Sequence, residues 1–222
     1  MRGRYKLERQ FDVARLLRDL ETAERVGTRL THHTPSVHDG GWSAIPLVSV
    51  NGEQDLSALK TYKRGRFEKT SVVEECPYFN EIIDSFKCSK RRVRLMRLEP
   101  QRRVLPHQDP DQTWAMGITR IHIPIVTNDK VEFVHDGQQV VMKPGELWYL
   151  DFSQFHSVAN LGDEPRVHLV LDLEVNSWLA RQFPPETLGE RLRNLVYRLR
   201  LKAFNCRGMW RLPRLRRRLW PL

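Results

Sequence analysis

Short apolar or alternating runs fill the middle of the chain, between residues 92 and 174. The Gly, Pro, Asn and Asp residues that tight turns use separate successive runs, and no helical periodicity interrupts them. The runs cover residues 93–100, 117–127, 131–137, 138–145, 146–152, 156–164 and 165–174. About seven strands at this spacing predict a mainly β fold, an antiparallel barrel or jelly roll.

Apolar residues recur at helical spacing in two segments before this region. Residues 11–27 form the first predicted helix, with Asp12 as its N-cap. Residues 77–86 form the second, with Pro77 in the first turn, where proline is tolerated. We therefore expect α-helices that flank the β core.

A third helix is predicted over residues 187–204, after the strands. Thr187 and Glu190 form a capping box at its start, and its polar face is rich in arginine. We expect the helix to pack on the barrel with its charged face in solvent, and residues 207–218 to be a disordered basic end. Its apolar stripe consists of Leu188, Leu192, Leu195, Val196 and Leu199.

The length of 222 residues fits one domain, or one domain with an appendage. We assign residues 1–175 to the domain, with a helical part at about 1–91 and the jelly-roll core at about 92–175. Residues 176–222 form the basic amphipathic helix and tail. Hydrophobic residues at 40% and charged residues at 29% exclude a fully disordered chain.

Positive charge is concentrated at the C-terminal end. The formal net charge is +10, but residues 191–222 hold eleven Lys or Arg and no Asp or Glu, so residues 1–190 carry a net charge of −1. A neutral core makes nucleic acid an unlikely partner. The basic end could touch a membrane surface, nucleic acid or an acidic peptide, and one hypothesis is that it attracts an acidic substrate or carrier.

Features of membrane and secreted proteins are missing from the sequence. No stretch approaches the ~20 apolar residues of a membrane span, and the N-terminus lacks the apolar core of a secretory signal. Cys76, Cys88 and Cys206 are too scattered for a disulfide framework, and the first two are most simply small buried residues. We expect a cytoplasmic protein.

Two of the predicted strands have one apolar and one polar face. In residues 118–126, isoleucines alternate with Arg120 and His122. In residues 165–174, aliphatic residues alternate with Arg166, His168 and Asp172. The polar faces lie either in water or around a pocket, and Arg and His there suit anions or metals. For His168 and Asp172 we expect ordinary surface ion pairing.

One set of residues has the composition of a metal site. His107 and Asp109 are one residue apart, so an extended segment would direct both side chains to the same side. His156, between a strand and a turn, is the natural third ligand. Two His and one carboxylate hold non-haem Fe(II) and leave positions for a chelating cosubstrate and O₂. The simpler alternative is a hydrogen-bonded surface dyad. Arg166 could grip a carboxylate bidentately, or form a surface ion pair.

Other candidates carry weaker signals. Trp42 and Trp114 could wall a substrate pocket or pack in the core. His135 reads as a turn residue. A second group of ligand-type residues has no spacing that fixes a geometry, and a solvated loop explains it better; its members are His32, His33, His38 and Asp39.

Residues 93–112, 117–128 and 142–175 together resemble the aspartyl/asparaginyl β-hydroxylase family of Fe(II)/2-oxoglutarate dioxygenases, which includes bacterial proline-type hydroxylases. The similarity covers about residues 72–175, and upstream segments resemble the family's N-terminal part. The resemblance implies a double-stranded β-helix core, and a hydroxylase that converts an unactivated C–H bond while 2-oxoglutarate becomes succinate and CO₂. It favours a bacterial protein.

The resemblance also implies roles for individual residues. His107, Asp109 and His156 would be the iron ligands, and Arg166 would bind the distal carboxylate of 2-oxoglutarate. Arg120 and His122 would lie near its iron-chelating end. Asp109 places the chain nearer the bacterial members, because the animal enzymes have Gly there. One departure is the sequence Gln-Arg-Arg at residues 101–103, where many relatives have a Pro-Gly turn.

Three functions remain open on the sequence. The first is a hydroxylase of an amino acid, or of an Asp or Asn residue in a peptide. The second is a non-catalytic barrel that binds a metal and a dicarboxylate as a sensor. The third is a nucleic-acid-associated oxygenase that uses the basic tail.

Overall fold

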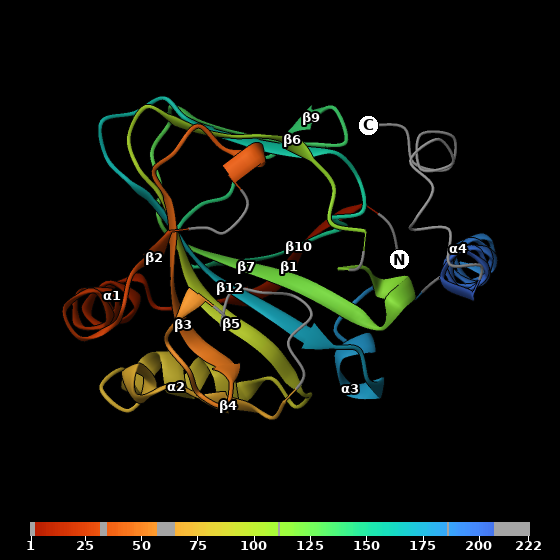
Figure 1. The fold of residues 1–222 in the computed structure, drawn as a ribbon, viewed down its shortest axis with the longest axis horizontal. Coiled ribbons are helices and arrows are strands. Elements are labelled where there is room, and N and C mark those ends of the chain that lie inside the picture. Colours follow the sequence, from red (N-terminus) through yellow and green to blue (C-terminus); the bar gives the residue numbers. More distant parts are fainter. Residues whose placement is uncertain (1–2, 32–34, 57–64, 111, 186, 207–222) are drawn as a thin grey trace.

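The computed structural model describes residues 3–31, 35–56, 65–110, 112–185 and 187–206. Two antiparallel β-sheets face each other, and two helices cover the outer side of the larger sheet (Figure 1). Side chains from both sheets meet in an inner apolar cluster that includes Leu98, Phe133 and Val158. The predicted mainly β jelly roll with flanking helices is confirmed.

The larger sheet has eight strands. In spatial order these are β1 (Arg4–Gln10), β10 (Glu146–Leu150), β7 (Ile118–Val126), β12 (Arg166–Glu174), β5 (Lys90–Leu98), β3 (Trp42–Val50) and β2 (Leu30–Thr31), and β4 (Phe67–Lys69) pairs with β3. The smaller sheet runs in the order β6 (Arg102–His107), β11 (His156–Asn160), β8 (Val131–His135) and β9 (Gln138–Gln139).

The helices and short 3₁₀ turns begin and end close to the predicted signals. Asp12 caps α1 (Val13–Val26) by accepting a hydrogen bond from the Arg15 backbone N–H at 3.0 Å. Pro77 opens α2 (Pro77–Ser85), as expected. The remaining elements are α3 (Ser177–Ala180), α4 (Leu188–Cys206), η1 (Pro35–Val37), η3 (Ser71–Val73) and η4 (Trp114–Met116).

The two-faced strands are buried on both sides. The isoleucines of β7 and the leucines of β12 pack with residues of α1 and α2 in the main core. The opposite side of the same strands carries Arg120, His122, Arg166, His168 and Asp172, all buried. The polar face is therefore buried between the two sheets and does not lie in water.

Residues 1–91 contribute more β-structure than a helical part would. They supply β1, β2, β3 and β4 to the larger sheet. The sequence of β1, Arg-Tyr-Lys-Leu-Glu-Arg-Gln, is polar because this strand lies at the sheet edge. The sequence also did not predict β6. The unusual Gln-Arg-Arg segment gave no clear signal for the chain after Pro100, and in the structure Gln101, at φ 57°, forms the turn that leads into this strand.

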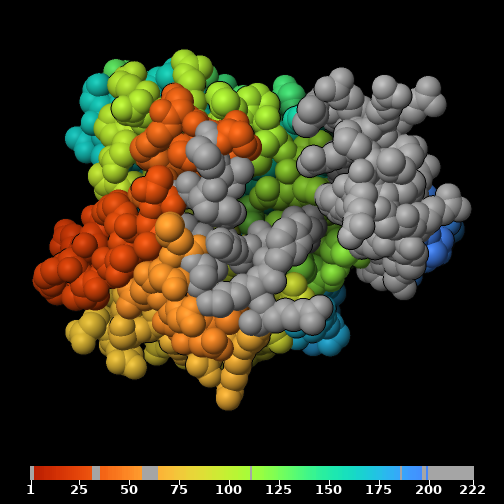
Figure 2. Space-filling view, in the orientation of Figure 1, coloured from red at the N-terminus to blue at the C-terminus, as the bar shows by residue number. Residues whose placement is uncertain are grey.

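The C-terminal helix forms, but it does not pack as expected. Thr187 and Glu190 make the predicted reciprocal cap, with hydrogen bonds of 2.9 and 3.2 Å. The apolar stripe is exposed, with Leu188 84% accessible, so the expectation that it covers the barrel is wrong. Among the described side chains of α4, Asn194 is buried instead, and the helix contacts η4. α1 and α4 lie at opposite edges of the molecule (Figures 1 and 2).

Candidate active site

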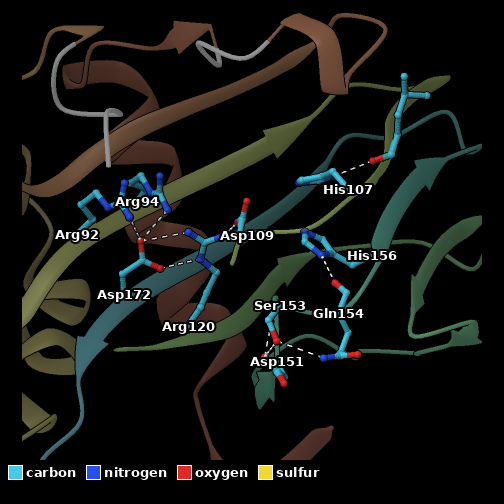
Figure 3. A network of polar contacts seen from close by, with 11 residues as sticks. Arg92, Arg94, His107, Asp109, Arg120, Asp151, Ser153, Gln154, His156 and Asp172 are labelled. Carbon is cyan, nitrogen blue, oxygen red and sulfur yellow. Dashed lines mark hydrogen bonds and ion pairs between the residues drawn. The ribbon is translucent and has the colours of Figure 1, made fainter. Parts of the chain in front are cut away.

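Strand pairing brings the three candidate metal ligands together. His107, the last residue of β6, is the register partner of His156, the first residue of β11. Asp109 follows two residues later, and its backbone N–H donates to the Phe152 carbonyl at 2.8 Å. One ligand atom from each side chain lies within 4.8 Å of the others (Figure 3). In the part of the chain that the structure describes, no other such group is found.

Backbone carbonyls fix which nitrogen of each histidine can bind a metal. The Nδ1 atom of His107 lies 2.8 Å from the Leu105 carbonyl, and that of His156 lies 3.0 Å from the Gln154 carbonyl (Figure 3). A carbonyl oxygen only accepts, so each Nδ1 carries the proton and each Nε2 keeps its lone pair. Burial, and then His107, lower the pKa of His156 to about 3, so this ring is neutral at pH 7.

The carboxylate of Asp109 is held by an arginine. Arg120 NH1 donates to Asp109 Oδ2 at 2.6 Å, which leaves Oδ1 for a metal. Burial acts to raise the pKa of Asp109, but Arg120 holds that pKa below its usual value. Arg120 also donates through Nε to Asp172 Oδ1 at 2.7 Å (Figure 3). Asp172, Arg120 and Asp109 thus form a continuous chain that orients one metal ligand.

Asp172 is a buried carboxylate that three arginines surround. Arg92 and Arg94 each place an NH2 group 3.0 Å from its Oδ2 atom. Burial acts to raise the pKa of Asp172, but Arg120, and then Arg92 and Arg94, hold that pKa far below its usual value, so the carboxylate stays ionised. Burial lowers the pKa of Arg94 to about 9. The expected surface ion pair at Asp172 is therefore wrong, since its side chain is 1% exposed.

A second buried arginine has a different environment. Arg166 NH2 donates to His168 Nδ1 at 3.1 Å, and its Nε has no hydrogen-bond partner among the described residues. Burial lowers the pKa of Arg166 to about 9. His168 also approaches His122, with 3.3 Å between the Nδ1 atoms, and is 1% exposed, so its expected surface position is wrong. Burial holds the pKa of both histidines well below the usual value.

Aromatic contacts connect this arginine to the metal ligands. The Phe152 ring contacts His156, with ring centroids 4.6 Å apart, and stacks on His122 at 5.1 Å. His122 in turn contacts His168, which accepts a hydrogen bond from Arg166. The triad and Arg166 therefore line the same interior between the two sheets.

Several predicted residues occupy other positions. Arg120 was expected at the cosubstrate, but its guanidinium is taken up by Asp109 and Asp172. Trp114 packs against Tyr149 and Phe183 in the main core, which corrects its place in a substrate wall. Trp42 lies 6.4 Å from His107, measured between ring centroids. His122 is buried and stacks on Phe152, and its position near the cosubstrate stays a prediction.

Two further expectations can be compared with the structure. His135 is fully buried on β8, and its Nε2 lies 2.9 Å from the Asp151 carbonyl, so it is more than a turn residue. Asp39 accepts from the Arg103 backbone N–H at 2.8 Å, and His38 forms a bridge with β6. His32, His33 and residues 207–218 lie outside the described residues.

The sequence reading missed Arg92 and Arg94. Both alternate with Val93 and Leu95 along β5, the same period of two that marked Arg120 and Arg166. The signal was present, but arginines on a strand are more often exposed.

Both implied cofactors fit the residues present. Two imidazole nitrogens and a carboxylate on one side of a metal form the facial set that suits non-haem Fe(II). A buried guanidinium with an unpaired N–H suits the distal carboxylate of 2-oxoglutarate. Fold and donor set together are those of the Fe(II)/2-oxoglutarate oxygenases.

The chain belongs to the aspartyl/asparaginyl β-hydroxylase family. The family model described as "Aspartyl/Asparaginyl beta-hydroxylase" matches residues 11–175. This confirms the predicted family, whose cofactors are Fe(II), 2-oxoglutarate and O₂.

Curated relatives and a solved structure agree with this assignment. The chain is 29% identical over 177 residues to L-proline cis-4-hydroxylase of Rhizobium meliloti, which covers 76% of this chain and 60% of the relative. It is 28% identical over 174 residues to L-proline cis-3-hydroxylase 1 of a Streptomyces species, covering 74% and 57%. The chain thus spans less than two thirds of the length of either.

A crystal structure of an oxidoreductase of the 2OG-Fe(II) oxygenase family from Burkholderia pseudomallei shares the fold. The TM-score is 0.54 at 16% identity, over 78% of this chain and 85% of that one. At this identity the similarity shows the fold alone.

Proposed function

We propose that the protein is an Fe(II)/2-oxoglutarate-dependent hydroxylase of a free amino acid of the proline type. The observation that carries the proposal is Arg166, a buried cation without a carboxylate partner in the described residues, in the same interior as His107, Asp109 and His156. A buried charge is costly unless it is paired, so this position is built for an anionic ligand.

In this proposal His107, Asp109 and His156 hold Fe(II), and Arg166 holds the distal carboxylate of 2-oxoglutarate. Arg166 donates to His168, so the Nδ1 of His168 accepts and the imidazole directs the guanidinium. Bound Fe(II) and 2-oxoglutarate supply the oxidising chemistry, in which O₂ and 2-oxoglutarate give succinate, CO₂ and a hydroxylated substrate. The chain's own residues bind, orient and exclude water.

The charge around Asp172 supports an amino-acid substrate with a free carboxylate. Arg94 and Arg120 contact the Asp172 carboxylate, and Arg120 also contacts that of Asp109. Arg94 Nε also has no hydrogen-bond partner in the described part of the chain. A free amino acid brings a carboxylate that can accept a hydrogen bond from this N–H, whereas an internal peptide residue has none.

The relatives and the aromatic residue near the proposed metal ligands indicate which side chain the substrate amino acid has. Both curated relatives are named as proline hydroxylases. The Trp42 ring lies 6.4 Å from the His107 ring, measured between centroids, which puts an aromatic side chain beside the proposed metal ligands. L-Proline is therefore the first substrate to test.

The test is turnover of 2-oxoglutarate by the purified full-length chain with Fe(II) and ascorbate. Succinate and the hydroxylated product are measured by mass spectrometry with L-proline and other free amino acids, with prolinamide as matched control, and with an Asp-containing peptide. We expect amino-acid-dependent succinate and no stimulation by prolinamide, which lacks the carboxylate. Turnover with the peptide alone would refute the substrate class, and no iron-dependent succinate with any compound would refute the function.

A further inference from the structure

The five aliphatic residues of the apolar stripe of helix α4, from Leu188 to Leu199, lie on the solvent-exposed side of the helix. Successive residues of an α-helix are about 100° apart, so the five residues of the stripe lie within roughly 100° of the helix circumference. Their exposed fractions are 84% for Leu188, 61% for Leu192, 52% for Leu195, 40% for Val196 and 56% for Leu199.

On the opposite side of α4, the polar residues Glu190 and Asn194 face the protein. Asn194 is 9% exposed, and the helix contacts η4. Glu190 lies one turn before Asn194 on the same side of the helix. Burial raises the pKa of Tyr5 in β1, and the negative charge of Glu190 adds a smaller effect in the same direction, so Glu190 lies near this strand. A helix of a globular protein normally turns its apolar stripe to the core. Here the orientation is reversed, and an exposed apolar patch of this kind marks an interaction surface.

The charge of this segment selects the partner. Arg191 and Arg193 are exposed beside the stripe, and residues 191–222 contain eleven Lys or Arg without one Asp or Glu. Two copies of the chain that met through α4 would bring these like charges together. Nucleic acid would satisfy the charge but offers no apolar medium for five aliphatic side chains. A bilayer with anionic lipids provides both an acyl region and negative headgroups.

We propose that α4 docks on anionic membrane surfaces, with its apolar stripe in the acyl boundary and the arginines at the headgroups. The stripe from Leu188 to Leu199 is about 17 Å long at 1.5 Å per residue, so the helix lies in the plane of the interface. Among the described residues, no helix is long and apolar enough to cross a membrane. The association is therefore peripheral, and it is independent of the chemistry at the iron site.

The experiment is co-sedimentation of the full-length protein with phosphatidylcholine vesicles that contain or lack phosphatidylglycerol. We expect binding to the anionic vesicles only, weakened by salt. The double variant Leu192→Gln/Leu195→Gln should lose about tenfold or more in partitioning, because two leucines no longer enter the acyl region. Arg191→Gln/Arg193→Gln should also lose roughly tenfold or more on anionic vesicles. The matched control is Leu17→Gln/Leu56→Gln, which changes two leucines exposed elsewhere, and it should bind like wild type.

Three results would overturn the proposal. The first is no vesicle binding, or equal binding to neutral and anionic vesicles. The second is binding that the α4 leucine variant leaves unchanged. The third is concentration-dependent dimerisation that the same variant abolishes while vesicles bind nothing, which would make this face a contact between copies. Unchanged urea midpoints of all variants show that folding is not the cause.

Discussion

Replacing Asp172 by asparagine tests the buried charge network that supports the active site. The carboxylate accepts from Arg92 and Arg94 at 3.0 Å and from Arg120 at 2.7 Å. Asp172→Asn keeps the size but removes the negative charge, and it points amide hydrogens at arginines that can only donate. Arg120 then keeps only its contact with Asp109 among the carboxylates of the described residues.

The expected loss of stability is large. Removing one partner of a buried ion pair costs about 3–5 kcal/mol, because the remaining charge is left unpaired. For a chain of this size, about 3 kcal/mol lowers the melting temperature by roughly 6–12 °C. Without the Asp172 carboxylate, the Arg120 guanidinium can shift and move the Asp109 side chain to which it is paired. The affinity for Mn(II) should therefore fall about 10–100-fold, as for other groups that orient a metal ligand.

Urea unfolding and Mn(II) titration of the purified variant measure both effects. The matched control is Asp163→Asn, the same substitution in an ion pair with Lys130 whose side chains are 85% and 66% exposed. It should cost less than about 0.5 kcal/mol and leave metal affinity unchanged. If Asp172→Asn changes the unfolding free energy and the Mn(II) affinity as little as the control does, the arginine network neither stabilises the fold nor orients Asp109.

The stability that Asp172 contributes should also have a defined pH dependence. Its folded pKa is held far below the unfolded value of about 4. A depressed pKa contributes stability above the unfolded pKa, and this contribution is lost as pH falls toward the folded pKa. The difference in unfolding free energy between wild type and Asp172→Asn should thus be constant from pH 7 to pH 5 and shrink below about pH 4. A difference that already shrinks at pH 6 would contradict this assignment.

Three further predictions concern other parts of the interior. Arg166→Gln should raise the KM for 2-oxoglutarate at least about tenfold without changing Mn(II) affinity, and an unchanged KM would remove Arg166 from the cosubstrate site. Trp114→Ala should cost about 3–5 kcal/mol in urea unfolding because it leaves a core cavity, whereas Trp42→Ala should mainly raise the KM for the amino acid; the reverse pattern would contradict the two placements. His122 and His168 have depressed pKa values, so stability should fall as pH drops below about 6.5, by up to about 1.4 kcal/mol per pH unit for each ring, and a flat urea midpoint from pH 7 to pH 5 would refute their neutral burial.

Local signals predicted the elements whose geometry local chemistry determines. Asp12, Pro77 and the Thr187–Glu190 pair mark helix starts through backbone hydrogen bonds that depend on few neighbours. The alternation in β7 and β12 gave the two faces of the strands, because successive strand residues point to opposite sides. The strand sequences did not show whether the polar face is buried or exposed to water, because that depends on the position of the second sheet.

Partners distant in sequence explain most of the corrections. Arg120 was read as an anion-binding residue, but Asp109 and Asp172, 11 and 52 residues away, occupy its donors. Strand β1 was missed because its alternation is short, with only Tyr5 and Leu7 on the apolar side, and its partner β10 lies about 140 residues later. The stripe of α4 predicted the helix correctly and its packing incorrectly, since amphipathicity gives an apolar face but not what covers it.

A crystal structure of the protein soaked anaerobically with Mn(II) and 2-oxoglutarate would test the central claim most directly. The account predicts metal density bound by the Nε2 atoms of His107 and His156 and by Asp109, with the distal carboxylate of 2-oxoglutarate paired to Arg166. Metal bound elsewhere, or a cosubstrate whose distal carboxylate lies away from Arg166, would contradict it.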